Sequence, residues 1–98
     1  MANSMKSAAF LIESRLAEAA KGSSSAYYEL GVIYSTGSEG VDVDLIEAHK
    51  WFNLASLSGH DESKVCRAEI SLEMTAREIA EAQREARGWL QETSRRAA

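Results

Sequence analysis

The sequence predicts an all-α protein: one small domain of about five helices arranged as antiparallel hairpins. Three observations predict this fold class. Proline is absent while Ala, Glu, Leu and Arg are abundant, a composition that favours helix over sheet. Apolar residues recur at spacings of three and four. Glycines and short polar loops separate these stretches, and short connections between helices indicate antiparallel neighbours.

The first helix is expected over residues 4–21, with Gly22 ending it at the C′ position. Its expected buried face consists of Phe10, Leu16, Ala17 and Ala20. The serines at 23–25 offer an N-cap to a second helix over 25–36. The apolar stripe of this helix consists of Ala26, Leu30, Ile33 and Tyr34. Gly31 lies inside it at a cost of about 1 kcal/mol relative to Ala, which predicts close approach of a neighbouring helix.

A loop over 37–43 follows, and its glycines Gly37 and Gly40 predict backbone with positive φ. The third helix is expected to begin at Asp44, because Asp44 and Glu47 have the spacing of a capping box. Its apolar stripe consists of Leu45, Ala48, Trp51, Phe52 and Ala55. Gly59 is expected to end this helix.

Two further helices complete the chain. The fourth is expected over 61–74, and its predicted inward face consists of Val65, Ala68 and Leu72. The fifth begins at Thr75, which has the T-x-x-E spacing of a capping box with Glu78. The apolar face of the fifth helix consists of Ile79, Ala82, Ala86, Trp89 and Leu90.

The chain also repeats weakly with a period of 37 residues, which separates Gly22 from Gly59 and Ala26 from Ser63. One such unit cannot bury its own apolar face, whereas stacked units can. We therefore expect a single domain, 1–98, that contains a preceding helix (1–22), a complete repeat (24–60), a degenerate repeat with a capping helix (61–93) and a tail (94–98).

One dense pattern covers most of the complete unit: Ala26-x3-Leu30-Gly31-x2-Tyr34-x2-Gly37, then Gly40-Val41-x2-Asp44-x3-Ala48-x2-Trp51-x3-Ala55-x3-Gly59-His60. It resembles the Sel1-like repeat, a relative of the tetratricopeptide repeat. Residues 74–83 and Trp89 are similar to the closing helices of some bacterial members. After Ser63 the expected Leu-Gly pair is replaced by Arg67 and Ala68, so only one unit is complete.

The resemblance implies a right-handed α/α superhelix that acts as an adaptor or scaffold and binds another protein or a peptide. It implies no catalysis and no cofactor. In tetratricopeptide-like stacks the first helix of each unit lines the concave side. By analogy, the expected partner-binding residues are Tyr28, Val32, Ser35, Glu62, Val65 and Glu69, with Leu72 as the counterpart of Ser35. Tyrosine supplies stiff contact area, and acidic groups select a basic or amine-bearing segment. The alternative is that Tyr28 and Val65 pack against the neighbouring hairpin and that Glu62 and Glu69 are solvated charges.

The first helix offers a second surface. Phe10, Leu11 and Ile12 are consecutive, so they cannot all face one core, and we expect one of them to point outward or into a partner. The alternative function is therefore a self-associating structural module, in which a homodimer through this helix completes the stack.

The charge pattern disfavours a nucleic-acid partner. The net charge is −4, residues 1–74 contain six basic and eleven acidic residues, and the five Arg of the last helix alternate with four Glu. No apolar run approaches the ~20 residues of a membrane span. The apolar run before Glu13 is too short for a signal peptide. We expect a cytoplasmic protein without membrane contact.

Catalytic and metal sites have little support in the sequence. The single cysteine, Cys66, excludes an intrachain disulfide and is expected to be a small, partly buried side chain. His60, Glu62 and Cys66 are not followed by a second ligand pair, and His49 is expected on the exposed side of the third helix. No G-x-S-x-G motif or phosphate-binding loop occurs. We expect no metal, no cofactor and no enzyme activity.

Overall fold

The structure, a computed structural model, describes residues 2–97 of the chain and the side chains of residues 8–96. The described residues form five α-helices and one short 3-10 helix, and no strand occurs among them. In chain order the elements are α1 (Ala2–Ala20), α2 (Ser24–Thr36), η1 (Ser38–Gly40), α3 (Leu45–Leu57), α4 (Asp61–Ser71) and α5 (Ala76–Ala97). The all-α prediction is confirmed.

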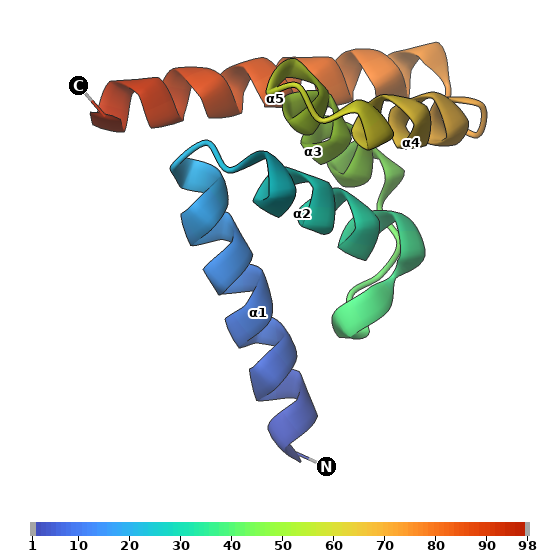
Figure 1. Cartoon of the computed structure of the whole chain (residues 1–98). Helices are drawn as coiled ribbons and strands as arrows, with labels where there is room; N and C mark the ends of the chain where they lie inside the picture. The colour runs from blue at the N-terminus through green and yellow to red at the C-terminus, as the bar shows by residue number, and fades with distance from the viewer. Residues whose placement is uncertain (1, 98) are drawn as a thin grey trace.

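The central helix of the array is α3, because α2, α4 and α5 all pack against it. Figure 1 shows α5 along the top of the molecule, with α3 and α4 beneath its first half. α1 packs mainly against α2, and its N-terminal end lies farthest from α5 (Figure 1). The helices from α1 to α4 each contact the next one in the chain, as expected for a repeat array, whereas α5 packs against α3.

The helix ends follow the same period as the sequence. α1 and α3 are both closed by a glycine in the left-handed conformation, with φ of 87° at Gly22 and 90° at Gly59. After each glycine, the next backbone N–H donates to the carbonyl five residues back, at 3.2 and 3.0 Å. These are the bonds of a Schellman motif. The 37-residue period of the sequence is therefore also a period of the backbone.

The two predicted capping boxes differ. At α5 the box is complete: the Thr75 N–H donates to Glu78 Oε1 at 2.8 Å, and the Glu78 N–H donates to Thr75 Oγ1 at 3.1 Å. At α3 only half of it forms, through the Glu47 N–H and Asp44 Oδ1 at 3.0 Å. The Glu47 carboxylate accepts from the Trp51 indole N–H instead, at 3.1 Å. The buried indole thus takes the acceptor that the box would have used.

α2 and α3 form an antiparallel hairpin around Gly31. The last turn of α2 meets the start of α3, where the Asp44 N–H donates to the Tyr34 carbonyl at 2.9 Å. Midway along both helices, a Cβ on Gly31 would lie 2.5 Å from ring atoms of Phe52. The predicted close approach at Gly31 is confirmed, and the group that approaches is an aromatic ring of α3.

The main core cluster draws on four helices and consists of Ala19, Ala26, Tyr27, Leu30, Trp51, Leu54, Ala55 and Ala86. The predicted buried face of α1 is correct only at Leu16. Its other members are exposed: Phe10, Ala17 and Ala20. The inward stripe of α1 consists of Ile12, Leu16 and Ala19. An ion pair between Arg15 and Glu29 of α2 lies at the same interface.

α4 is rotated relative to its predicted register. The three residues expected to face inward are exposed: Val65, Ala68 and Leu72. The inward positions are Ser63, Cys66 and Ile70, and Ile70 joins Ala48 and Phe52 in a second core cluster. Ser63 can be fully buried because its hydroxyl lies 2.8 Å from His60 Nδ1 and so has a polar partner.

α5 packs mainly against α3 and not against α4, for a reason visible in the repeat. The core-facing positions of α2 are Tyr27, Leu30 and Tyr34. Their counterparts 37 residues later in α4 are Lys64, Arg67 and Ser71. Because these polar residues offer α5 no apolar face, α5 covers α3 instead, with Trp89 edge-on to Trp51 at a centroid distance of 4.8 Å. α5 continues through residues 94–97, which were predicted to be a tail.

Candidate functional site

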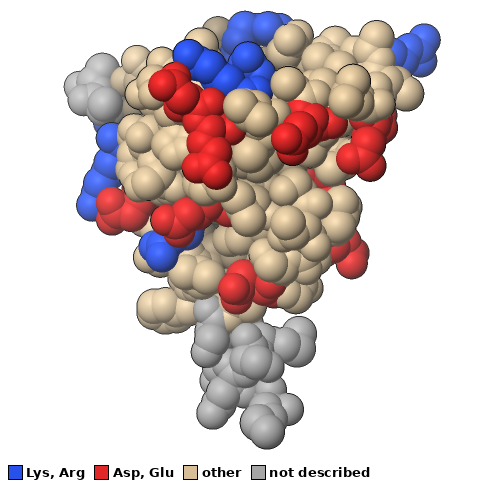
Figure 2. Space-filling model, turned by 45° about the vertical axis from the view of Figure 1, so that its right-hand side comes forward, with Lys and Arg blue, Asp and Glu red and all other residues tan. Residues whose placement is uncertain are grey.

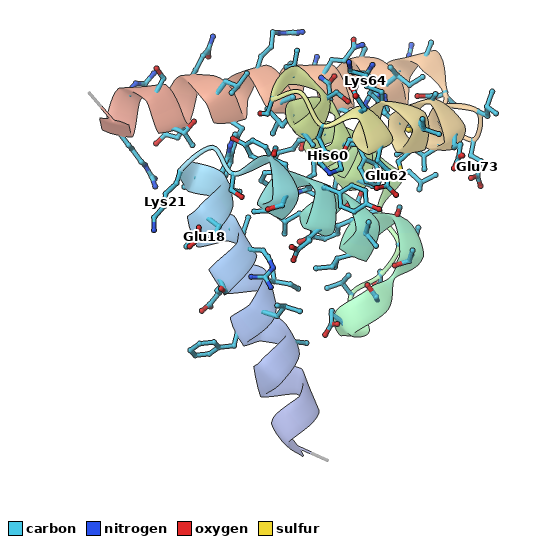
Figure 3. All side chains as sticks on the ribbon, viewed as in Figure 1. Glu18, Lys21, His60, Glu62, Lys64 and Glu73 are labelled. Atoms are coloured by element: carbon cyan, nitrogen blue, oxygen red, sulfur yellow. The ribbon has the colours of Figure 1, made fainter. Side chains whose placement is uncertain are left out.

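The first helices of the two units, α2 and α4, are joined by Tyr28. Its hydroxyl donates a hydrogen bond to Glu62 Oε1 at 3.1 Å. Its ring stacks on the imidazole of His60, with ring centroids 4.7 Å apart. It also lies beside the ring of Phe52 of α3, with ring centroids 6.0 Å apart. Figure 3 shows Glu62 and His60 close together between α4 and α2. Two of the predicted contact residues, Tyr28 and Glu62, are thus brought into direct contact.

His60 has a role that sequence reasoning missed: it is the N-cap of α4. Its Nδ1 accepts from the Ser63 backbone N–H at 3.3 Å, which requires the neutral tautomer with hydrogen on Nε2. The period of 37 residues aligns His60 with Ser23, whose hydroxyl caps α2 by accepting from the Ala26 N–H at 3.3 Å. This alignment could have predicted the capping role of His60, because Ser23 lies in the serine triplet that was expected to cap α2.

Negative charge dominates the junction of α2 and α4. Partial burial and the Glu62 carboxylate raise the pKa of the Tyr28 phenol above its ordinary value of 10.0. Partial burial, followed by the carboxylates of Glu69 and Glu62, raises the pKa of the Cys66 thiol above 9.0. Both groups therefore remain protonated at neutral pH, and Cys66 is not an activated nucleophile.

The other predicted contact residues have different surroundings. Val32 is half-buried and packs against the second core cluster. The Ser35 hydroxyl donates to the Val32 carbonyl at 3.2 Å, so it is bound within its own helix. On α4, Val65 is 58% exposed and Glu69 is exposed. The structure thus presents Val65 and Glu69 to solvent, whereas Val32 contributes to the core.

Leu72, the C-cap residue directly after α4, extends the exposed apolar surface of this helix. It is 89% exposed and follows Val65 by seven residues, or nearly two helical turns. We therefore define the α2–α4 face as six residues: Tyr28, Val32, Glu62, Val65, Glu69 and Leu72.

Acidic side chains surround uncharged surface on this side of the molecule, and Lys and Arg lie mainly along the upper edge and the left in Figure 2. No Lys or Arg occurs between residues 24 and 49. The cations of α4 are engaged elsewhere: Lys64 pairs with Asp61 at 3.3 Å, and Arg67 donates to Asn53 of α3. Figure 3 shows Lys64 on the opposite side of α4 from Glu62. The face therefore has a negative potential.

The three consecutive apolar residues of α1 point in different directions, as expected for neighbours in a helix. Phe10 is 75% exposed, whereas Leu11 and Ile12 are half-buried and Ile12 packs against the main core cluster. Phe10 is therefore the residue that points outward.

His49 was expected on the exposed side of its helix, and that expectation is wrong. Its side chain is only 3% exposed, because α3 is enclosed by three other helices. Among the described residues, its Nδ1 has no hydrogen-bond partner. Burial and the nearby Arg67 lower its pKa from 6.5, so the ring is neutral at neutral pH. Within the part of the chain that the structure describes, no three His, Cys, Asp or Glu side chains are placed to hold a metal ion.

A shallow hollow of about 350 Å³ lies away from the α2–α4 face, between the α1–α2 turn and the second half of α5. Lys21, Tyr27 and Leu90 contribute to its wall. Figure 3 shows Lys21 and Glu18 together at that end of α1, where their side chains pair at 3.7 Å. Among the described helices, none is both long enough and apolar enough to cross a bilayer.

The hairpin of α2 and α3, the paired helix ends and the period of 37 residues define an α-helical repeat protein. Residues 24–60 match the Sel1 repeat family. These residues therefore form a Sel1 repeat, as the sequence pattern predicted. Sel1 repeats generally mediate protein–protein interaction, and the family is a non-catalytic one. No curated protein and no solved structure matches the chain.

Proposed function

We propose that this protein is an adaptor that binds a segment of another protein through the α2–α4 face. The observation that carries the proposal is the Tyr28–Glu62 hydrogen bond, because it makes the first helices of two successive units one continuous surface. The proposal assigns the chain a binding role and no reaction.

Two properties of the face support this role. The Tyr28 ring is held between His60 and Phe52, so it would lose little conformational entropy when a partner contacts it. Val65 and Leu72 present apolar side chains to solvent, and apolar surface rimmed by polar residues is typical of interaction sites. Two helices offer less than the ~800 Å² per partner of a standard interface, so we expect weak or transient binding.

The test is affinity capture from the source cells, followed by binding measurements with the purified partner. Wild type is compared with Leu72→Ser and with Leu57→Ser, a matched control, because Leu57 is 67% exposed on α3 and outside the α2–α4 face. We expect a partner that wild type and Leu57→Ser bind equally and that Leu72→Ser binds at least about tenfold more weakly.

Both variants should retain the helical circular dichroism of wild type, because both side chains are exposed. The proposal would be wrong if every captured partner bound Leu72→Ser as tightly as wild type.

A second candidate function is self-association through α1, and the exposure of Phe10 favours it. Light scattering of wild type and Phe10→Ser tests this candidate. A dimer that the substitution converts into a folded monomer supports it. A wild-type monomer at all concentrations removes it.

A further inference from the structure

The outer flank of α4 carries apolar side chains that no described residue covers. Val65 is 58% and Leu72 is 89% exposed, and their spacing of seven places them on the same side of the helix, about 10 Å apart along its axis. Glu69 lies between them in sequence and on the same side. We call Val65, Glu69 and Leu72 the α4 flank.

The repeat indicates what kind of group fits there. The counterpart of Val65, 37 residues earlier, is Tyr28 of α2. In the structure Tyr28 is contacted by residues at the start of α4, His60 and Glu62, and stays partly exposed. The α4 flank is therefore the position at which the first helix of a further unit would lie. The following helix of this chain, α5, does not take that position, because it packs mainly against α3.

The charge around the α4 flank restricts the occupant. Glu69 lies on the flank, Glu62 precedes it by about two turns, and Glu73 follows it by four residues, two positions beyond the end of α4. Among the described residues, neither Glu69 nor Glu73 forms an ion pair, whereas both cations of α4 are directed elsewhere. Figure 3 shows Glu73 at the far end of α4 from His60. A cationic occupant would complement this potential.

We propose that the α4 flank is a docking surface for a basic amphipathic helix of a partner protein. Its apolar side would cover Val65 and Leu72, and its Lys or Arg residues would pair with Glu62, Glu69 and Glu73. A second copy of this chain is a poor match, since the net charge is −4 and the Arg-containing helix α5 already turns its apolar side to α3. This inference rests on the proposed function and names the class of partner.

The experiment uses fluorescent peptides of about five helical turns and measures anisotropy with the full chain. One peptide has Leu on one face and Lys on the rest, a second has Glu in place of Lys, and a third has the first composition in scrambled order. We expect binding of the first peptide only, weakened by added salt. Equal binding of the scrambled peptide, or no binding of the first, would overturn the inference.

Variants locate the binding. Glu69→Gln/Glu73→Gln should weaken binding of the Lys peptide about fivefold, and Val65→Ser/Leu72→Ser about tenfold or more. Glu13→Gln/Glu85→Gln makes the same change in net charge on α1 and α5, and it should change binding less than about twofold. An equal loss in this control would show that charge alone attracts the peptide.

The inference and the proposed function fail in different ways. A natural partner whose binding depends on Leu72 but is insensitive to salt and to Glu69→Gln/Glu73→Gln would overturn the basic-helix inference and leave the adaptor function standing. A natural partner that is insensitive to Leu72→Ser would overturn the adaptor function.

Discussion

Two glycines lie inside helices of this protein in opposite surroundings. At Gly31 an added Cβ would meet the Phe52 ring at 2.5 Å, and Phe52 is only 1% exposed, so the ring cannot turn out into solvent. At Gly88, in α5, nothing lies within 4 Å of the added atom. Close packing thus requires glycine at the first position and not at the second.

Gly31→Leu should therefore lower the free energy of unfolding by about 3 kcal/mol or more, because it overpacks the α2–α3 contact. Gly88→Ala should raise it by up to about 1 kcal/mol, because Ala restricts the unfolded chain and favours helix. Urea denaturation measures both. A neutral Gly31→Leu variant would contradict the packing described for the hairpin.

Burial of His49 predicts a pH dependence. Its folded-state pKa is lowered from 6.5, so below pH 6.5 the unfolded state takes up a proton that the folded state resists. Stability that is fully present above this pH is then lost as pH falls, by at most about 1.4 kcal/mol per pH unit. Denaturation of wild type and His49→Leu at several pH values should show this loss in wild type only. Parallel curves for the two proteins would contradict it.

For single residues, the sequence predicted the packing of a position that is set by one neighbouring helix. It did not predict burial that is set by several helices or by a polar partner. The constraint at Gly31 was predictable, since a glycine within a helical stripe has a known cost. Burial of His49 was not, because it follows from the enclosure of α3 by three other helices. Burial of Ser63 depends on its partner His60, which no pattern of apolar residues reveals.

At the scale of elements, α4 is the helix whose position depends most on its cap. It has eleven residues, too few for a stable isolated helix, and its N-terminus is held by His60, which also stacks on Tyr28. The same residue thus caps α4 and positions it against α2.

His60→Ala should lower the free energy of unfolding by about 1–2 kcal/mol, because it removes both the cap and the stacking contact. His60→Asn, whose side-chain oxygen can accept from the same N–H, should lose clearly less. Thermal denaturation monitored by circular dichroism compares the two variants, and the melting temperature of a domain of this size shifts by roughly 4–8 °C per kcal/mol. Equal losses would indicate that capping contributes little.

The existence and order of the helices were predictable because glycines, caps and stripes mark each boundary locally. The rotations of α1 and α4 were not. Ranking residues by apolarity placed Phe10 and Leu72 inward, yet both are exposed. The inward side of α4 consists instead of one large apolar residue, Ile70, and two small residues, Ser63 and Cys66. In the candidate site, the Tyr28–Glu62 contact joins two residues that the repeat analogy had already selected.

At the scale of the whole molecule, the outer face of α1 differs from that of an internal repeat helix. In α3 the residues Trp51, Leu54 and Ala55 are buried in the main core cluster. Their counterparts 37 residues earlier in α1 are exposed: Ser14, Ala17 and Glu18. This side of α1 is therefore suited to solvent, and among its described side chains Phe10 is the one large exposed apolar group, which is common on the surface of a monomer.

We therefore expect light scattering to give a monomer for wild type and for Phe10→Ser alike. A wild-type dimer that Phe10→Ser dissociates would instead show that α1 is an interface and would favour self-association over binding of a separate partner.

The most direct test of the central claim, that a partner binds at the α2–α4 face, is photo-crosslinking from single positions in the source cells. A photoreactive phenylalanine analogue is placed at position 72 on the face or at position 57 on α3, two exposed sites that tolerate a large side chain. We expect a covalent adduct with one partner protein from position 72 and none from position 57. Adducts from position 57 alone, or the same adducts from both positions, would contradict it.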